Sequence, residues 1–140
     1  HLQPSQITVD NGDKYFRTSS TCHMSNLPHP LARAMDEKIA FALGIHLSYS
    51  EEIQAQHYLP GQEFKAHTDY FEPRTPEYET HARVRGNRTW TFMVYLNNTP
   101  KGGGTHFTEL NETFYPRKGT TVVWNNVLPD GRPNPNTKHA

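Results

Sequence analysis

The chain has 140 residues, of which 34% are hydrophobic and 20% charged, and this length suits one domain with a single modest core. Fourteen basic side chains balance fourteen acidic ones, so the charge gives no case for binding nucleic acid or an anionic membrane surface. Cys22 is the only cysteine, which excludes an internal disulfide and suits a reducing compartment. No apolar run approaches the roughly 20 residues of a membrane span. These features predict a cytoplasmic domain that acts on a small molecule or a peptide.

The first third of the chain is predicted to contain a hairpin and one helix. Residues 6–9 and 14–17 read as short strands around a tight Asn-Gly turn. A helix is predicted over residues 30–43, where apolar side chains recur near helical spacing, at Leu31, Met35, Ile39 and Leu43. Pro30 suits the first turn of this helix, and Gly44 suits its C-terminal cap.

The rest of the chain predicts short strands and two connecting segments. The strands are expected at residues 53–59, 64–69, 89–96, 105–107, 113–115 and 120–124. Residues 72–87 are charged, show no clear period and read as a long loop of the kind that serves as a lid or binding element. Residues 129–136 read as a turn-rich connector. We therefore expect a mainly β (α+β) fold, a double-stranded β-helix or jelly roll, with at least one helix packed outside the barrel.

His67 and Asp69 form an H-x-D pair on the strand predicted over residues 64–69. Side chains at positions i and i+2 of a strand point to the same face, so both can reach one ion while Thr68 points away. Two imidazoles and one carboxylate on one side of a metal are the ligand set of non-haem Fe(II) oxygenases. Because the pair alone has a high risk of arising by chance, its sequence context must decide.

That context carries a family resemblance. The segments are RTSSTC (17–22), HYLPGQEFKAHTDYF (57–71), RTWTFMVYLNN (88–98), GGGTHF (102–107), PRKGTTVVWNN (116–126) and the final KHA. In this order and at these intervals they resemble the catalytic domain of the prolyl 4-hydroxylase family, which are Fe(II)- and 2-oxoglutarate-dependent dioxygenases. The resemblance covers nearly the whole chain.

The resemblance implies that His67, Asp69 and His139 bind Fe(II), acting as metal ligands and not as acid–base groups. Taken alone, a histidine beside the end of a chain would be read as a solvated surface group. The other seven of the nine histidines have polar, loop or outward-facing positions, and none of them is predicted to be a ligand.

The resemblance also implies a pocket for the cosubstrate 2-oxoglutarate. Tyr58 and Thr105 are the expected hydroxyl donors to its far carboxylate, because a buried carboxylate needs such partners, and Tyr95 lines the same pocket. The alternation over residues 89–96 supports this, since Tyr95 shares one face with Thr91. The alternative, that Tyr58 and Tyr95 are core aromatics with their hydroxyls at the rim, stays open.

The chain departs from the family pattern at its end. The family has a Lys or Arg several residues after the distal histidine, which pairs with the far carboxylate, whereas here only Ala140 follows His139. Lys138 would point to the opposite side of a strand and is no substitute. We therefore expect residues 1–140 to be a single catalytic domain that is incomplete after His139, and the native protein to be longer or this chain to hold 2-oxoglutarate poorly.

The function implied by the resemblance is hydroxylation of a peptidyl residue, most of all proline, with O2 consumed and succinate and CO2 formed, and with ascorbate as a further cofactor. Arg88 matches a substrate-side arginine of the family, while Trp90 and Trp124 are assigned to packing. Three alternatives remain: a non-catalytic module that binds proline-rich peptides, a 2-oxoglutarate oxygenase with another substrate, and a cupin-like metalloenzyme. The last expects H-x-H, so Asp69 argues against it.

Overall fold

The structure, a computed structural model, describes residues 1–7, 12–24 and 29–140. In these ranges the chain is mostly β with few helices, and it divides into two compact units. Residues 1–6 and 17–62 form the first unit, and residues 7–16 and 63–140 form the second. Each unit is described by itself below. No helix of the described residues is long and apolar enough to cross a membrane.

The first unit contains an antiparallel sheet in the order β1 (Gln3–Pro4), β2 (Ser20–His23) and β3 (Gln54–His57). The strand β3 falls within the predicted range 53–59. The strand β2 was not among the predicted strands; it forms through hydrogen bonds to both of its neighbours, with Thr21 and Cys22 buried.

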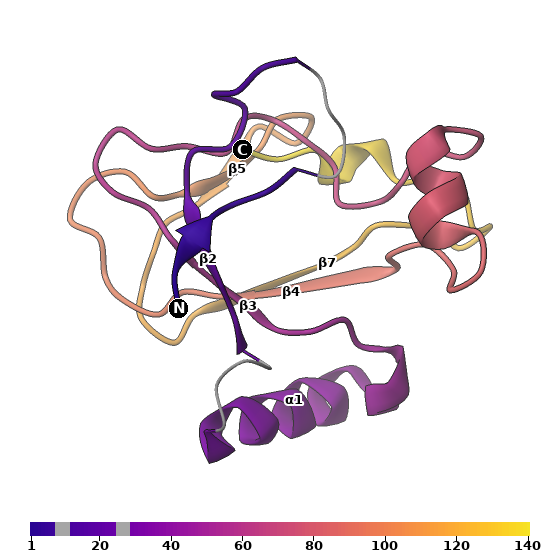
Figure 1. Cartoon of the computed structure of the whole chain (residues 1–140), viewed down its shortest axis with the longest axis horizontal. Coiled ribbons are helices and arrows are strands. Elements are labelled where there is room, and N and C mark those ends of the chain that lie inside the picture. Colours follow the sequence, from indigo (N-terminus) through magenta and orange to yellow (C-terminus); the bar gives the residue numbers. More distant parts are fainter. Residues whose placement is uncertain (8–11, 25–28) are drawn as a thin grey trace. The chain divides into compact units, whose positions relative to one another are not determined.

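The helix α1 (Pro30–Leu43) also belongs to the first unit, and its bounds are the predicted ones (Figure 1). The Nδ1 atom of His29 accepts a hydrogen bond from the N–H of Leu31, which caps the first turn. Gly44 ends the helix in the left-handed conformation at φ 66°, where a side chain would be strained. The helix is therefore specified by local signals at both ends.

The N-terminal hairpin prediction is only partly testable. Residues 8–11 of the predicted strand 6–9 and its turn lie outside the described residues. The second strand, predicted over residues 14–17, is wrong: residues 14–16 form a turn in which the N–H of Phe16 donates to the carbonyl of Asp13 (2.9 Å). An aspartate is a favourable first residue for such a turn.

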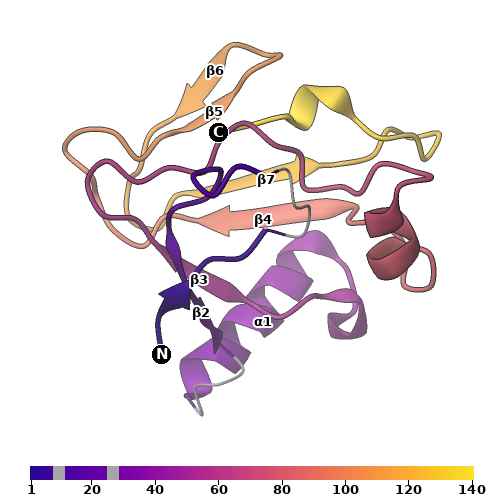
Figure 2. The same ribbon diagram turned by 45° about the horizontal axis from the view of Figure 1, so that its top comes forward.

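The second unit contains two antiparallel strand pairs, whose four strands are labelled in Figure 2. β4 (Trp90–Val94) pairs with β7 (Thr121–Asn125), and β5 (Thr105–Phe107) pairs with β6 (Glu112–Phe114). The core of the unit consists of Phe107, Val122 and Trp124, with Met93 and Tyr95 packed against it. Most ends of these four strands lie within one residue of the predicted ends.

Two expectations for the second unit, the loop 72–87 and the packing of Trp90, need correction, whereas the turn-rich connector agrees with the structure. The predicted loop 72–87 contains a short π-helical turn, Tyr78–Ala82, in which Ala82 is buried. The connector 129–136 runs into a 3-10 turn, Pro135–Thr137. Trp124 is buried as expected of a packing residue, whereas Trp90 is 43% exposed because it lies on the opposite face of the strand pair from the core.

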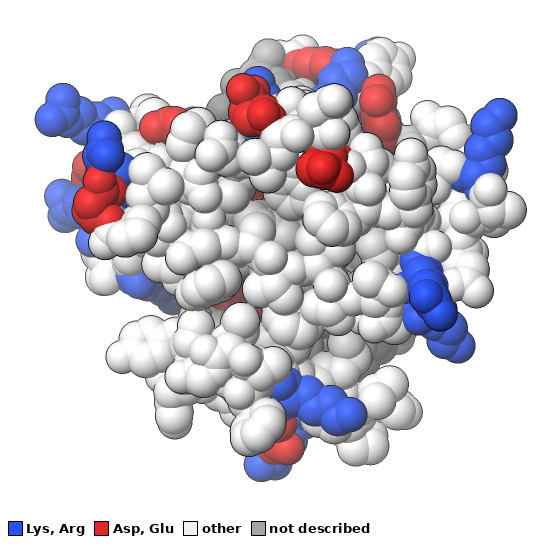
Figure 3. All heavy atoms as spheres, turned by 180° about the vertical axis from the view of Figure 1, so that it is seen from behind, with Lys and Arg blue, Asp and Glu red and all other residues white. Residues whose placement is uncertain are grey.

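On the face drawn in Figure 3, charged side chains lie mainly toward the edges, where some acidic and basic groups are neighbours, and the middle of the face is largely uncharged. Exposed ion pairs of this kind include Arg33 with Glu37, Arg83 with Glu79 and Arg132 with Asp130. Pairs so exposed contribute little to stability.

Candidate metal centre

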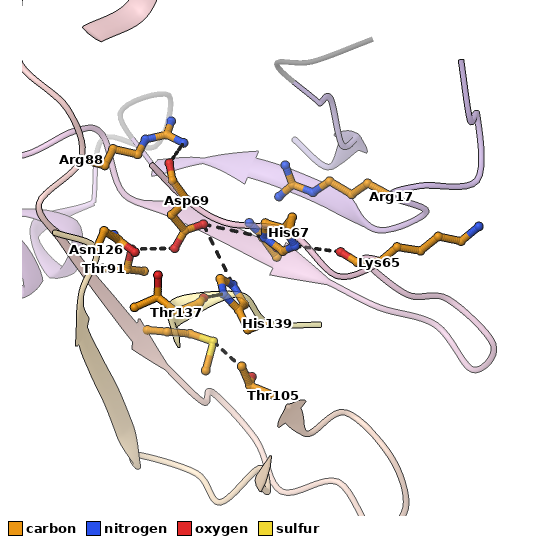
Figure 4. A network of polar contacts seen from close by, with 12 residues as sticks. Arg17, Lys65, His67, Asp69, Arg88, Thr91, Thr105, Asn126, Thr137 and His139 are labelled. Atoms are coloured by element: carbon orange, nitrogen blue, oxygen red, sulfur yellow. Dashed lines mark hydrogen bonds and ion pairs between the residues drawn. The ribbon is translucent and has the colours of Figure 1, made fainter. Parts of the chain in front are cut away.

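Two histidines and one aspartate converge in the second unit (Figure 4). Ligand atoms of His67, Asp69 and His139 all lie within 4.8 Å of one another. The Oδ1 atom of Asp69 is 3.7 Å from Nε2 of His67 and 4.0 Å from Nε2 of His139. His139 is buried and the other two side chains are half-buried. Among the described residues, this is the one group of histidine, cysteine and acidic side chains close enough to share an ion.

The backbone brings the three residues together in a way that differs from the prediction. Residues 64–69, all of them described, form no regular strand; His67 makes an isolated bridge to His139. The N–H of each of these histidines donates to the carbonyl of the other, at 2.9 Å in both directions. His139 is also bridged to Phe107 at the end of β5. The last residues of the chain thus run between His67 and β5.

Hydrogen bonds fix the tautomer of both imidazoles. Nδ1 of His67 lies 2.8 Å from the carbonyl oxygen of Lys65, and Nδ1 of His139 lies 2.8 Å from that of Thr137. A carbonyl oxygen can only accept, so both Nδ1 atoms carry the proton. In the neutral rings the lone pairs are then on Nε2, the atoms that face Asp69. Both histidines therefore present a metal-ligating nitrogen to the same point.

Aromatic side chains hold the two imidazole rings. Phe64 stacks on His67 with the ring centroids 3.5 Å apart. Trp124 and Phe107 pack beside His139 at centroid distances of 4.9 Å and 5.5 Å. An apolar shell of this kind limits the rotation of the ligands and the access of water.

The Asp69 carboxylate is held on the side away from the histidines. Its Oδ2 atom accepts a hydrogen bond of 2.6 Å from the hydroxyl of Thr91 on β4, and Thr91 in turn accepts one of 2.8 Å from the amide of Asn126. The backbone carbonyl of Asp69 accepts from Arg88 at 3.3 Å, and the Arg88 guanidinium lies over the ring of Phe71. Arg88 thus supports the segment around Asp69, and its role in substrate binding stays a prediction.

The predicted cosubstrate residues divide between the two units. Tyr95 and Thr105 lie together in the second unit, with 2.9 Å between their hydroxyl oxygens. Thr105 is buried beside Met93, and the Tyr95 hydroxyl also donates to the carbonyl of Phe114 (2.8 Å). Tyr58 belongs to the first unit, where its hydroxyl donates to Gln56 (3.0 Å), so its role in the pocket stays a prediction.

Two residues that contribute to the candidate metal centre, Thr91 and Asn126, were not assigned a role from the sequence. Thr91 was placed on the same face as Tyr95, but nothing in the sequence indicated that its hydroxyl would contact Asp69. Asn126 follows β7 and is fully buried, and no local pattern marks it. The converging donors, two neutral imidazole nitrogens and one carboxylate oxygen, fit a divalent first-row metal ion such as Fe(II).

The family follows from comparison with known proteins. Residues 53–140 match the model of the 2OG-Fe(II) oxygenase superfamily. The chain therefore belongs to this superfamily, and the predicted resemblance to the prolyl 4-hydroxylase family is confirmed.

Several proteins that are similar in sequence to this chain are prolyl 4-hydroxylase alpha subunits. Prolyl 4-hydroxylase subunit alpha-1 of Homo sapiens is 29% identical over 134 residues, which are 96% of this chain and 25% of that protein. The subunit of the same name from Gallus gallus is 29% identical over 126 residues, and that from Caenorhabditis elegans 27% over 125 residues, with 24% and 22% of their lengths covered. The chain thus spans about a quarter of the length of these relatives.

One solved structure supports the fold. The crystal structure of viral collagen prolyl hydroxylase from Paramecium Bursaria Chlorella virus-1, as the 2OG complex, superposes with a TM-score of 0.68. The match covers 88% of this chain and 69% of the viral chain, at 23% sequence identity. It shows that the two chains share a fold.

Proposed function

We propose that this chain is an Fe(II)- and 2-oxoglutarate-dependent dioxygenase that hydroxylates a peptidyl residue, with proline as the expected target. The single observation that carries the proposal is the convergence of His67, Asp69 and His139, with both imidazoles fixed in the tautomer that presents Nε2 to Asp69. Membership of the oxygenase superfamily and the prolyl 4-hydroxylase relatives support the rest. The expected fold is a single jelly-roll catalytic domain, and the expected location is the cytoplasm.

In this proposal the three ligands hold Fe(II), which together with 2-oxoglutarate and O2 supplies the oxidation of a C–H bond and releases succinate and CO2. The chain's own residues bind and orient the reactants. Thr105 and Tyr95 place hydroxyl groups for the far carboxylate of 2-oxoglutarate, with Tyr58 as a further donor. Arg88 is proposed to contact the peptide. Ascorbate is an expected additional cofactor.

The proposal is tested first by binding. The purified chain is titrated anaerobically with Fe(II) in the presence and absence of 2-oxoglutarate, and the weak visible metal-to-ligand charge-transfer band of the chelate is recorded. We expect the band only when both are present, and we expect Asp69→Ala to abolish it. His106→Ala is the matched control, because the imidazole of His106 bonds to Thr113 (2.9 Å) outside the group of ligands.

Activity is then tested on proline-containing peptides, with mass spectrometry to detect the gain of one oxygen atom. Hydroxylated peptide and succinate in equal amounts would support the whole proposal. Iron binding without a charge-transfer band would mean that residues 1–140 do not hold 2-oxoglutarate, and a chain that continues past Ala140 would then be titrated. A missing band in that longer chain as well would contradict the cosubstrate part and favour a non-catalytic peptide-binding module. A band with no peptide product would contradict the substrate and favour a 2-oxoglutarate oxygenase with another target.

A further inference from the structure

A chain of two hydrogen bonds leads from a buried amide to the carboxylate of the candidate metal centre (Figure 4). The Nδ2 atom of Asn126 lies 2.8 Å from Oγ1 of Thr91, and this oxygen lies 2.6 Å from Oδ2 of Asp69. Thr91 is on β4, while Asn126 directly follows β7, the strand paired with β4. The three residues are therefore held by the same strand pair.

The direction of both bonds follows from the chemistry of the groups. An ionised carboxylate can only accept, so the single hydroxyl proton of Thr91 goes to Asp69. The Thr91 oxygen is then available only as an acceptor, and Asn126 must turn its NH2 group toward it. This fixes the orientation of an amide whose oxygen and nitrogen would otherwise be hard to assign.

The orientation leaves the other end of the amide unsatisfied. Asn126 is 0% exposed, and its Oδ1 atom has no hydrogen-bond partner among the described residues. A buried carbonyl oxygen without a partner lowers the stability of a fold. An apolar side chain of similar size would avoid this cost, so the gain in folding free energy does not explain why an asparagine occupies the position.

The effect on Asp69 offers an explanation. The terminal torsion of an aspartate side chain is broad and has two nearly equivalent orientations, so an unrestrained carboxylate can offer either oxygen or both. The Thr91 hydroxyl occupies Oδ2, which leaves Oδ1 on the side of His67 and His139, at 3.7 Å and 4.0 Å from their Nε2 atoms. Partners of this kind orient metal ligands and raise metal affinity.

We propose that Thr91 and Asn126 are positioning residues that hold the Asp69 carboxylate so that Oδ1 alone binds the metal. Thr91 acts directly on the carboxylate, and Asn126 acts through Thr91 by keeping its hydroxyl proton directed at Oδ2. The inference deepens the proposed function and rests on it, because the ion concerned is the one that His67, Asp69 and His139 hold.

The test replaces the polar groups while keeping their shape. Thr91→Val removes the hydroxyl, Thr91→Ser keeps it, and Asn126→Leu removes the amide. Each variant is titrated anaerobically with Co(II), which reports on its own coordination through its visible absorption, and the thermal midpoint of the metal-free protein is measured in parallel.

We expect Thr91→Val to weaken Co(II) binding about 10- to 100-fold and to change the shape of the visible bands, since the loss of such a partner has effects of this size. Thr91→Ser should restore both the affinity and the spectrum. Asn126→Leu should weaken Co(II) binding while the metal-free midpoint stays at or above the wild-type value. A residue needed only for packing would give the opposite pattern, with a lower midpoint and unchanged affinity.

Two results would overturn the inference. One is Thr91→Val with wild-type affinity and spectrum, and the other is Thr91→Ser as impaired as Thr91→Val. The wild-type chain tests the proposed function separately. If it binds no Co(II), the proposed metal site is contradicted, and the positioning role, which depends on that site, is contradicted as well. Tight wild-type binding with unchanged variants removes the positioning role alone.

Discussion

His67 and His139, which lie far apart in the sequence, are joined through their main chains by two hydrogen bonds of 2.9 Å, each donating its N–H to the carbonyl of the other. Each imidazole also donates from Nδ1 to the carbonyl two residues before it, on Lys65 and Thr137 respectively. The position and the tautomer of both histidines are thus set by the backbone. These backbone hydrogen bonds orient both histidines toward one point, an arrangement that favours metal binding.

The first prediction concerns Phe107, which packs beside His139. This residue is 4% exposed, and its ring lies 5.3 Å from that of Trp124 and 5.5 Å from that of His139. Phe107→Ala should lower the free energy of unfolding by about 3–5 kcal/mol, because it leaves a cavity in the core. It should also weaken metal binding, since the His139 ring would lose an aromatic side chain that packs beside it.

Urea denaturation of the metal-free protein measures the first effect and Co(II) titration the second. Phe114→Ala is the matched control, since Phe114 packs against the ring of Phe107 but is 45% exposed. A loss of stability in Phe114→Ala as large as that in Phe107→Ala would show that the core has been placed wrongly.

A second prediction concerns the close approach of β6 to Gly104, the residue before β5. A Cβ atom at Gly104 would lie 3.0 Å from Cγ2 of Thr113 and 3.3 Å from the carbonyl oxygen of Phe114. Gly104→Ala should therefore cost about 1–3 kcal/mol of stability through overpacking. Thr113→Ser removes the nearer methyl group and keeps a hydroxyl for the bond to His106.

The double variant Gly104→Ala with Thr113→Ser should recover part of that loss, as measured by the urea midpoint against each single variant. If Gly104→Ala lowers the stability equally in the wild type and in Thr113→Ser, the Thr113 methyl group is not the obstacle.

The third prediction separates cosubstrate binding from metal binding. Thr105 is buried, with its hydroxyl 2.9 Å from that of Tyr95. If it binds the far carboxylate of 2-oxoglutarate, Thr105→Val should weaken that affinity by about 10- to 100-fold, the range for a lost hydrogen bond to a charged group. The concentration of 2-oxoglutarate that half-saturates the charge-transfer band gives the value.

Thr105→Ser keeps the hydroxyl and should bind 2-oxoglutarate close to normally. Co(II) affinity should be unchanged in both variants, because Thr105 is not one of the three ligands. The assignment of Thr105 fails if Thr105→Val half-saturates at the wild-type concentration.

The fourth prediction concerns alkaline pH. Burial raises the pKa of Tyr70 above its ordinary value of 10.0, and the negative charge of Glu72 adds to the shift. A pKa that is higher in the folded than in the unfolded state gives stability that is fully present below the unfolded pKa and is lost as pH rises through the folded one. The protein should therefore lose stability from about pH 10 upward as the unfolded phenol ionises first.

Tyr70→Phe removes this titration, so the variant should lose less stability than the wild type over the same pH range. Urea midpoints measured at neutral pH and at several alkaline values give the comparison. Parallel curves for the two proteins would mean that Tyr70 ionises no later in the folded state than in the unfolded one.

Elements with strong local signals were predictable. The helix α1 (Pro30–Leu43) was predicted to the residue, since apolar spacing, Pro30 and the left-handed Gly44 are properties of the segment itself. The alternation along residues 89–96 likewise placed Thr91 and Tyr95 on one face, and in the structure Thr91 bonds to Asp69 and Tyr95 to Thr105.

Elements that depend on distant partners were not predictable. The strand expected over residues 64–69 is absent because this described segment makes only isolated bridges, and the bridge at His67 has His139 as its partner. The strand β2 forms between two neighbours that are distant in the sequence, β1 and β3. Asn126 gives no signal at all, because its contact with Thr91 arises from the pairing of β4 with β7.

The sequence by itself determined which donor groups the chain carries, the family it belongs to and the segments that carry the site. Only the tertiary structure decided how the backbone joins His139 to His67, which nitrogen of each imidazole faces Asp69, and which carboxylate oxygen Thr91 occupies. The reason is physical: residue types and periodicities are local properties, whereas the direction of a hydrogen bond depends on partners that long-range pairing brings into place.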